Sequence, residues 1–488
     1  MARLDMARSL GVVVCACAGW LLAQSLIWPE LSEFAWISIS CLVVCSELRL
    51  SGPVENGFAA GITFWFTLLG WATAPDGATS VGLQLASFTI AILESSYLVA
   101  WTYATRLLRS APLAIAAAAL GSLWALEELL RIVGDWAMPY GEIGASQSMT
   151  PLGLLGTAVG SPGVSAIVVA LAYAVARLFR ERGVRPNFAL MGAVVFVISV
   201  GCLPVTVGWP PGANELTIAA VPQVARSVSE FTSALRAADA LRPDLIVFPE
   251  GALQFPNGYD EVRKLQSALT PPADIAIGAS AEEPAGAQNV AILFSKAGAT
   301  LYAKQKLVPF GEFIPEKAIF GRLMSLRIDF VPGKDAALWS VDGIHIAPLI
   351  CFEVAFSNLT REAVAKGADA LLVMENNSWF SSAAGDSLQS AVARFRARSL
   401  GVDVAVVGTR GTAMVFHPGG QIENTYQGGA GVTALHIASP KPTLYAAWGN
   451  YPILLLGAGS VLALLLSRLV LRRYSARPLV SVGRKIIS

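Results

Sequence analysis

Residues 346–353 read Ile-Ala-Pro-Leu-Ile-Cys-Phe-Glu, a stretch in which a cysteine directly follows an apolar run. Five apolar residues typical of a buried strand end at Cys351, and a carboxylate, Glu353, follows two residues later. Side chains at the carboxyl end of a strand can project into a crevice, so Cys351 is a candidate nucleophile. The other five cysteines, at positions 15, 17, 41, 45 and 202, lie in apolar runs and indicate no disulfide framework.

Apolar runs on both sides of this stretch indicate a membrane protein. The chain has 488 residues, of which 54% are hydrophobic and 14% charged, and its mean hydropathy is +0.57. A helix needs about 17 to 25 apolar residues to cross a bilayer. Eight runs approach or meet this length, near residues 10–28, 33–49, 57–75, 81–103, 112–133, 160–179, 187–207 and 449–471. We therefore expect a seven-span region at 1–209, a catalytic domain outside the membrane at 210–445, and a final span with a tail at 446–488.

Arginines predict the orientation of these spans, because short cytoplasmic loops are enriched in Lys and Arg. They cluster before the first span, after the fourth, after the sixth and after the eighth. Both chain ends are then cytoplasmic, and residues 210–445 face the periplasm of a bacterial inner membrane. Alternatively, the first run is a signal peptide, since it has a basic start and small residues at 16–19. The net charge of +1 gives no reason to expect nucleic acid as a partner.

The polar region between the seventh and eighth spans alternates strands with amphipathic helices. Strands are expected near residues 216–221, 244–249, 274–279, 289–295, 299–302, 345–350, 369–374, 403–407, 412–416 and 431–437. Helices are expected near 226–241, 258–269, 357–366 and 386–400. The predicted fold is an α-β-β-α sandwich carried by a bundle of eight transmembrane helices.

Three of these strands end near an ionisable or reactive group: Glu250, Lys304 and Cys351. Each residue alone is ordinarily structural, because a buried Cys packs, a Glu caps a helix and a Lys is solvated. Together they suit acyl transfer through a thioester. A carboxylate takes the thiol proton, the sulfur attacks a carbonyl, and an ammonium stabilises the oxyanion. This chemistry requires no cofactor, and the sequence has no metal-ligand cluster or nucleotide-binding loop.

The residues around these three groups resemble the nitrilase superfamily. Phe-Pro-Glu at 248–250, Tyr-Ala-Lys at 302–304 and Ile-Cys-Phe-Glu at 350–353 match its Glu, Lys and Cys signatures. Leu-Val-Pro-Phe-Gly-Glu at 307–312 is similar to the membrane branch, the apolipoprotein N-acyltransferase family. The resemblance covers most of the chain and implies Glu250 as general base, Lys304 as oxyanion-stabilising cation and Cys351 as acylated nucleophile. Lys304 is preferred to Lys306 because the family's lysine lies eight positions before the Pro-Phe-Gly-Glu acid.

The same resemblance implies supporting residues. Glu312 matches a further carboxylate near the triad, and Glu353 matches the second acid after the cysteine. The backbone N–H of Phe352 would complete an oxyanion hole. Asn377 and Trp379 lie in a stretch similar to the family's Ser-Asn-Asp-x-Trp-Phe, and we expect them to bind substrate. Residues 394–400 resemble a helix that covers the site in the family.

The resemblance implies a specific reaction. A fatty acyl chain would move from a phospholipid, through a Cys351 thioester, to the N-terminal amine of a diacylglyceryl-cysteine lipoprotein. We expect a monomer whose partners are the membrane, the phospholipid donor and the lipoprotein acceptor.

Several positions depart from the family pattern, and they lie where substrate is expected to be held. Residues 220–227 lack a Gln-Gly-Asn-Ile stretch, Phe352 stands for the usual Tyr, and Arg410 lies in a replaced Asn-Thr-Gly word. Ala-Met-Pro-Tyr-Gly at 137–141 stands where Gly-x-Pro-Trp is expected. Three alternatives therefore stay open: a membrane-tethered carbon-nitrogen hydrolase of amidase or nitrilase type, a conjugal-transfer-associated relative with a different acceptor, and a non-catalytic scaffold of a secretion or conjugation machine.

Overall fold

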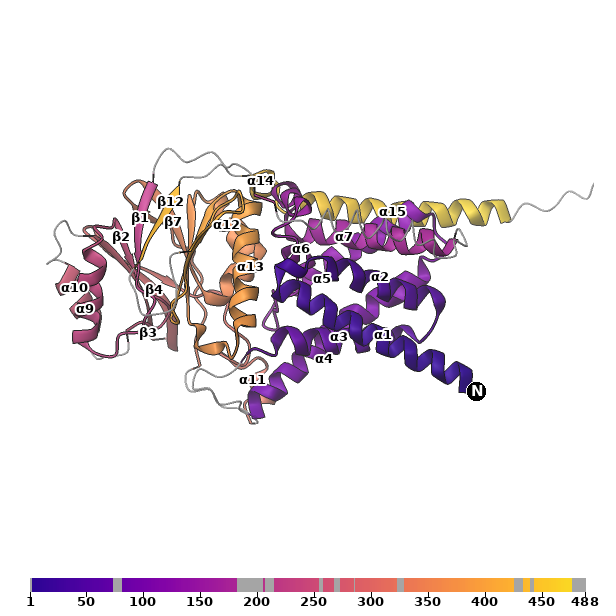
Figure 1. Cartoon of the computed structure of the whole chain (residues 1–488), viewed down its shortest axis with the longest axis horizontal. Helices are drawn as coiled ribbons and strands as arrows, with labels where there is room; N and C mark the ends of the chain where they lie inside the picture. The colour runs from indigo at the N-terminus through magenta and orange to yellow at the C-terminus, as the bar shows by residue number, and fades with distance from the viewer. Residues whose placement is uncertain are drawn as a thin grey trace, which may run out of the picture.

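The computed structural model places a two-sheet sandwich at one end of the molecule and long helices at the other (Figure 1). It describes residues 2–72, 81–181, 205–206, 215–253, 258–266, 273–284, 286–322, 329–424, 433–438 and 443–475. The predicted seventh span, 187–207, lies almost wholly outside the described residues.

The helical region follows the apolar runs of the sequence. Its helices are α1 (Ala2–Ile27), α2 (Glu33–Leu48), α3 (Pro53–Leu69), α4 (Val81–Leu107), α5 (Leu113–Leu130), the short α6 (Ile143–Ser146), α7 (Gly156–Glu181), α14 (Leu444–Trp448) and α15 (Tyr451–Ser475), with 3-10 turns at η1 (Pro29–Leu31) and η2 (Pro151–Leu155). The backbone of α7 is interrupted at Gly160, whose φ is 67°, two residues before Pro162. Proline removes a backbone donor and crowds the preceding turn, which accounts for the kink.

Three helical segments of the described chain are long and apolar enough to cross a bilayer. They are Asp5–Ile27, Leu113–Leu130 and Pro151–Leu178, and Tyr451–Ala463 is a shorter apolar helix. α2 and α3, with 16 and 17 residues, fall near the lower limit for a span. Membrane character is thus plausible on helix length and composition, whereas the full set of eight spans stays a prediction.

The first sheet carries two of the three reactive groups. Its strand order is β12-β1-β2-β3-β4-β5. The strands are β1 (Glu215–Ala220), β2 (Leu245–Val247), β3 (Asp274–Glu283), β4 (Gly286–Ser295), β5 (Gly298–Ala303) and β12 (Thr433–Ala438). β1, β2 and β3 run parallel, while β3, β4 and β5 form antiparallel pairs.

The second sheet carries the cysteine. Its order is β11-β10-β9-β8-β7-β6. The strands are β6 (Trp339–Val341), β7 (Ile344–Ile350), β8 (Ala370–Glu375), β9 (Asp403–Gly408), β10 (Ala413–Phe416) and β11 (Ile422–Asn424). Every predicted strand overlaps a strand of the structure, and among the strands of the described residues only the three-residue β6 and β11 were missed. Short edge strands bury few residues, so their hydrophobic pattern is weak.

The inner faces of the two sheets form one apolar core, which includes Leu216, Val247, Ile346, Ile350 and Leu372. α9 (Val228–Asp239) and α10 (Gly258–Gln266) pack on the outer face of the first sheet. α12 (Ser357–Ala365) and α13 (Ala383–Leu400) cover the outer face of the second. The remaining turns are α11 (Lys317–Phe320), η3 (Cys351–Ala355) and η4 (Asn377–Trp379). The layers therefore follow the predicted α-β-β-α order.

α13 lies between the second sheet and the long helices (Figure 1). Its residues Leu388, Val392 and Phe395 belong to the same apolar core as residues of α1 and α7. The contact is close at Gly156, where an added Cβ would lie 2.7 Å from the Phe395 ring. The sandwich and the helical region consequently share one buried apolar core through this helix.

Candidate functional site

Cys351 begins the η3 turn directly after β7, in a backbone conformation that side chains rarely adopt. Its φ is 51°, in the left-handed region, which costs roughly 1–3 kcal/mol for a residue other than Gly. Glu353 helps to hold the turn, because its Oε2 accepts a hydrogen bond from the Ile350 N–H at 2.8 Å. The parallel pairing of β7 with β8 sets Ile350 opposite Met374. Cys351 and Glu375, the next residues, therefore lie level with each other at the carboxyl ends of neighbouring strands. The sharp turn thus occurs where two parallel strands end, as in other open α/β crevices.

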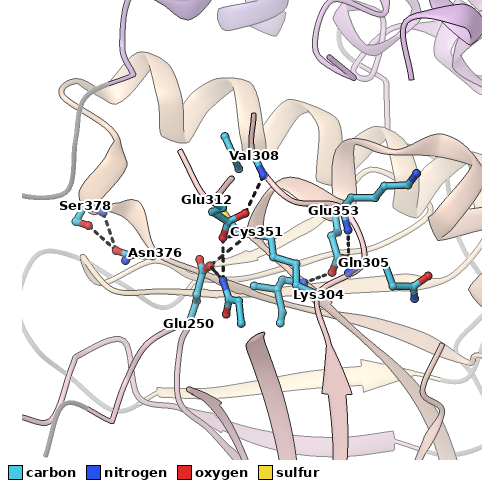
Figure 2. Close-up of polar contacts among 12 residues, drawn as sticks. Glu250, Lys304, Gln305, Val308, Glu312, Cys351, Glu353, Asn376 and Ser378 are labelled. Carbon is cyan, nitrogen blue, oxygen red and sulfur yellow. Dashed lines mark hydrogen bonds and ion pairs between the residues drawn. The ribbon is translucent and has the colours of Figure 1, made fainter. Parts of the chain in front are cut away.

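Glu250, Lys304 and Glu312 form one buried charge cluster beside Cys351 (Figure 2). The Lys304 Nζ lies 2.8 Å from Glu312 Oε1 and 3.4 Å from Glu250 Oε1. Asn289 on β4 donates from its Nδ2 to Glu250 Oε1 at 2.6 Å and to Glu312 Oε1 at 2.9 Å. One ammonium and one amide therefore bind both carboxylates.

The backbone around these groups leaves little freedom. Glu312 Oε2 accepts from the Val308 N–H at 2.8 Å, which closes the turn that contains the Pro-Phe-Gly-Glu word. Gly278 of β3 lies beneath Glu250, and a Cβ built on it would come within 2.5 Å of the Glu250 Cα. Only a glycine fits at that position, so β3 fixes the height of Glu250 above the sheet.

Burial and charge determine the protonation of the cluster. Burial raises the pKa of the Glu250 carboxyl, while the Lys304 ammonium opposes that rise. Burial would lower the pKa of Lys304, but the carboxylates of Glu250 and Glu312 outweigh it and the pKa is raised. Burial and the charge of Glu250 raise the pKa of the Cys351 thiol well above its ordinary value. The site at rest therefore holds a neutral thiol next to an ammonium and a proton acceptor.

Glu353 connects the lysine segment to the cysteine turn. Its Oε1 accepts from the backbone N–H groups of Gln305 at 2.7 Å and Lys306 at 3.1 Å, and both its oxygens lie 2.8 Å from the Tyr302 hydroxyl. With the Ile350 contact, this one fully buried carboxylate joins β5 to β7. Burial raises the pKa of Glu353 against these hydrogen bonds. Its position is that of a brace between two segments of the site.

The charge cluster and Cys351 lie in the wall of a mostly apolar pocket. Glu250, Lys304, Glu312 and Cys351 line it together, and it has about 770 Å³ of empty space, part of it open to the exterior. Its other walls come from the end of α3, from α4, from the loop before α6, and from the sandwich; they include Leu69, Trp71, Ile90, Met138, Tyr140 and Trp379. Long-chain apolar groups suit such walls, because burying apolar surface is favourable.

The remaining predicted residues differ in their placement. Trp379 and Phe352 line the pocket, and the Phe352 ring lies edge-on to Tyr140 at 5.6 Å between centroids. Asn377 is not among the lining residues. It is fully buried, and its Nδ2 donates to Asp386 at 2.8 Å and to Glu375 at 3.2 Å. Its contacts are those of a structural amide at the end of β8.

Four polar residues of the site were not identified from sequence: Asn289, Tyr140, Glu375 and Gln389. Asn289 had a detectable signal, since it is a polar residue at the start of an apolar strand pattern. Gln389 is far from Cys351 in sequence and gave no local signal, whereas Tyr140 lies in a stretch that departs from the family pattern without indicating its hydrogen bond. Burial raises the pKa of the Glu375 carboxyl to about 8. Within the described part of the chain, no group of three or more His, Cys, Asp or Glu residues is placed to hold a metal.

Comparisons with known proteins find matches for both the helical region and the sandwich. Residues 18–174 match the apolipoprotein N-acyltransferase N-terminal domain, and residues 218–434 match the carbon-nitrogen hydrolase domain. The chain is 29% identical to an apolipoprotein N-acyltransferase of Pseudomonas syringae pv. tomato, over 94% of this chain and 98% of that protein. It is 30% identical to one of Pseudomonas aeruginosa, over 82% of this chain and 84% of that protein.

Among solved structures, the chain is similar to a carbon-nitrogen hydrolase superfamily protein of Xanthomonas campestris. The sequence identity is 18% and the TM-score is 0.38, with 50% of this chain and 97% of that chain covered. The two family-domain matches follow each other along the chain. The first covers most of the helical region that precedes the sandwich, and the second covers most of the sandwich.

Proposed function

This chain belongs to the apolipoprotein N-acyltransferase family, and we propose that it moves a fatty acyl chain from a phospholipid to the N-terminal amine of a diacylglyceryl-cysteine lipoprotein, with Cys351 as the acyl carrier. N-acylation of lipoproteins is the activity for which its curated relatives are named. The observation that carries the proposal is the pocket itself. Glu250, Lys304 and Cys351 share one cavity whose other walls are apolar side chains, many of them from the helical region.

The proposed organisation retains the predicted boundaries. Residues 1–209 form seven spans, 210–445 the catalytic domain and 446–488 a last span with its tail. The arginine clusters place the catalytic domain on the periplasmic face of a bacterial inner membrane. A donor lipid could then enter the pocket between α3 and α4 side chains while its tails stay in hydrocarbon. The protein works as a monomer in this proposal.

In the first half-reaction, Glu250 accepts the Cys351 proton as the sulfur attacks an acyl ester carbonyl of the donor. The Sγ–C bond forms, the ester C–O bond breaks, and the departing oxygen takes the proton from Glu250. The products are a thioester on Cys351 and a lysophospholipid. The raised pKa of the thiol keeps it protonated until a carbonyl is present, so proton removal accompanies attack.

In the second half-reaction, the α-amine of the lipoprotein attacks the thioester carbonyl. Glu250 accepts the amine proton and returns it to the departing sulfur, so an amide forms and the thiol is regenerated. Lys304 stabilises the oxyanion in both steps, together with the backbone N–H of Phe352. Glu312 and Asn289 hold the ammonium and the base at their observed distances.

The test uses the full-length protein in phospholipid-containing detergent micelles, with a phospholipid labelled in its acyl chains. We expect a hydroxylamine-sensitive acyl group on the peptide that contains Cys351. Addition of a diacylglyceryl-cysteine lipopeptide with a free amine should discharge the label into an amide, whereas an N-acetylated lipopeptide should not. Cys351→Ala should abolish labelling, and Cys17→Ala, at an exposed position of α1, should retain it.

Three outcomes would redirect the proposal. Labelling that persists in Cys351→Ala would remove the cysteine from the mechanism. Release of free fatty acid or ammonia without lipopeptide acylation would favour the carbon-nitrogen hydrolase alternative. Full biological function of Cys351→Ala would favour a scaffold.

A further inference from the structure

The carbonyl groups of the Cys351 turn are bound by side chains of α13. Gln389 donates from its Nε2 to the carbonyl oxygen of Cys351 at 2.9 Å. Arg396 donates to the carbonyls of Val354 at 3.2 Å and Ala355 at 2.7 Å. The turn that carries the thiol is therefore held from outside its own strand.

The same two side chains bind the loop that precedes α6 in the helical region. The Tyr140 hydroxyl donates to Gln389 Oε1 at 2.6 Å, and Arg396 pairs with Glu142 Oε2 at 2.9 Å. The loop itself is fixed by Arg131 at the end of α5, which donates to the carbonyl of Gly141 at 3.2 Å. Two short bridges thus run from the helical region through α13 to the cysteine turn.

The Gln389 bridge is the one that reaches the cysteine itself. Gln389 and Tyr140 are 2% and 4% exposed, so water cannot readily replace a lost partner. Gln389 also binds Glu375, the buried carboxyl on the neighbouring strand. An unpaired buried polar group is costly, and the amide consequently has one favourable orientation, with its oxygen toward Tyr140 and its nitrogen toward Cys351.

We propose that Gln389, oriented by the Tyr140 hydroxyl, is a positioning residue that holds the Cys351 peptide in its left-handed conformation and so directs the thiol into the pocket. This inference rests on the proposed role of Cys351 as nucleophile. It assigns the helical region a part in the chemistry beyond that of a wall for lipid, because the second end of the bridge is a residue of its loop. Tyr140 lies in the 137–141 stretch where this chain departs from the family pattern, and that departure supplies the hydroxyl.

The decisive variant is Gln389→Met, which keeps the length of the side chain and removes its hydrogen bonds to Cys351, Tyr140 and Glu375. Tyr140→Phe removes only the hydroxyl and leaves the ring in contact with Phe352. Ser390→Ala, on the next residue of α13, is the matched control. Each full-length variant is assayed for acylation of Cys351 by labelled phospholipid, for alkylation of Cys351 by iodoacetamide, and for its thermal midpoint.

We expect kcat of acylation to fall roughly 10- to 100-fold in Gln389→Met, with KM changed less than about twofold, because a small displacement of a reacting group has effects of that size. Iodoacetamide alkylation should fall at least about fivefold in the same variant, which a purely structural role with an intact thermal midpoint would not produce. Tyr140→Phe should change both rates in the same direction by a smaller factor.

The inference is overturned if Gln389→Met acylates and alkylates within about twofold of Ser390→Ala. If Gln389→Met does not fold, wild-type rates in Tyr140→Phe overturn it instead. Cys351→Ala distinguishes a failure of the proposed nucleophile from a failure of the positioning role. Full transfer activity of Cys351→Ala removes the nucleophile and this inference with it, whereas an inactive Cys351→Ala beside a normal Gln389→Met removes the positioning role alone.

Discussion

The two sheets of the sandwich supply different parts of the site and are supported differently. The first sheet brings Glu250, Lys304 and Asn289 together, and their side-chain hydrogen bonds within the described part of the chain all go to residues of the sandwich. The second sheet brings Cys351, whose turn is bound by α13 and, through it, by the helical region. The charge cluster is thus fixed within the sandwich, while the geometry of the thiol depends on both regions of the molecule.

The largest effect should come from the cation of the first sheet. Lys304→Gln leaves the carboxylates of Glu250 and Glu312 without their ammonium and removes the proposed oxyanion stabiliser. We expect acylation to slow by about 10²- to 10³-fold. Lys306→Gln is the matched control, because the Lys306 ammonium lies over the Phe356 ring, 5.4 Å from its centroid. It should stay within about threefold of the unsubstituted protein, and an equal loss in both variants, measured with labelled phospholipid, would contradict the assignment of Lys304.

The next effect tests the brace between the sheets. Glu353→Gln keeps one acceptor oxygen but turns an amide toward backbone N–H groups that already donate. We expect a loss of about 1–3 kcal/mol in the free energy of unfolding. Acylation should also slow by roughly 10- to 100-fold, since the Lys304 segment and the Cys351 turn lose their common partner. Thermal unfolding and acylation rates measured on the same sample check the two effects, and unchanged stability would show that the brace contributes little.

A smaller effect is expected at Asn289, which acts only within the first sheet. Its hydrogen bond lowers the pKa of Glu250, so Asn289→Ala should raise that pKa further. Glu250 must be ionised to accept a proton, and the acidic limb of the kcat/KM profile should therefore move to higher pH. A rate loss of about tenfold is expected at neutral pH, the size of one hydrogen bond to a charged group. Ser295→Ala, at the far end of β4, is the control and should leave the profile unchanged.

The smallest effect concerns the second sheet and the pH dependence of stability. Burial raises the pKa of Glu375 to about 8 from an ordinary value of 4.5. The folded protein then binds a proton that the unfolded chain releases, so stability should fall as pH rises from about 4.5 to 8. The contribution of Glu375 is at most about 1.4 kcal/mol per pH unit. Glu375→Gln should flatten the thermal midpoint between pH 5 and 8, and an unchanged slope would assign the effect to Glu250 or Glu353, whose pKa values are also raised.

The sequence predicted the sandwich well because its strands are short apolar runs that end at turn residues or at reactive groups. It indicated Glu250, Lys304 and Cys351 for the same reason, since Lys304 and Cys351 directly follow β5 and β7 and Glu250 lies three residues after β2. The helical region was predicted in outline. α1, α5 and α7 contain segments long and apolar enough to span, whereas the other predicted spans do not meet that criterion in the described residues or lie outside them.

The polar contacts of the site could not be predicted from the sequence, and the reason is physical. Tyr140 and Gln389 are 249 positions apart, and no periodicity relates a loop hydroxyl to an amide on a distant helix. Asn377 illustrates the opposite case. It lies in a stretch that resembles a substrate-binding word, yet its amide binds Asp386 and Glu375 in the interior. A sequence motif locates a segment, but the direction of each side chain depends on packing.

The absence of a side chain at position 278 has a practical consequence for protein engineering. Because β3 approaches the Glu250 backbone so closely there, even Gly278→Ala must displace the backbone around Glu250 or β3 itself. A mutant library that aims to change the acyl chain accepted by the pocket should hold this glycine constant and vary Leu69, Ile90 and Met138 instead. Those three line the pocket from α3, α4 and the loop before α6, outside the strands that carry Glu250, Lys304 and Cys351.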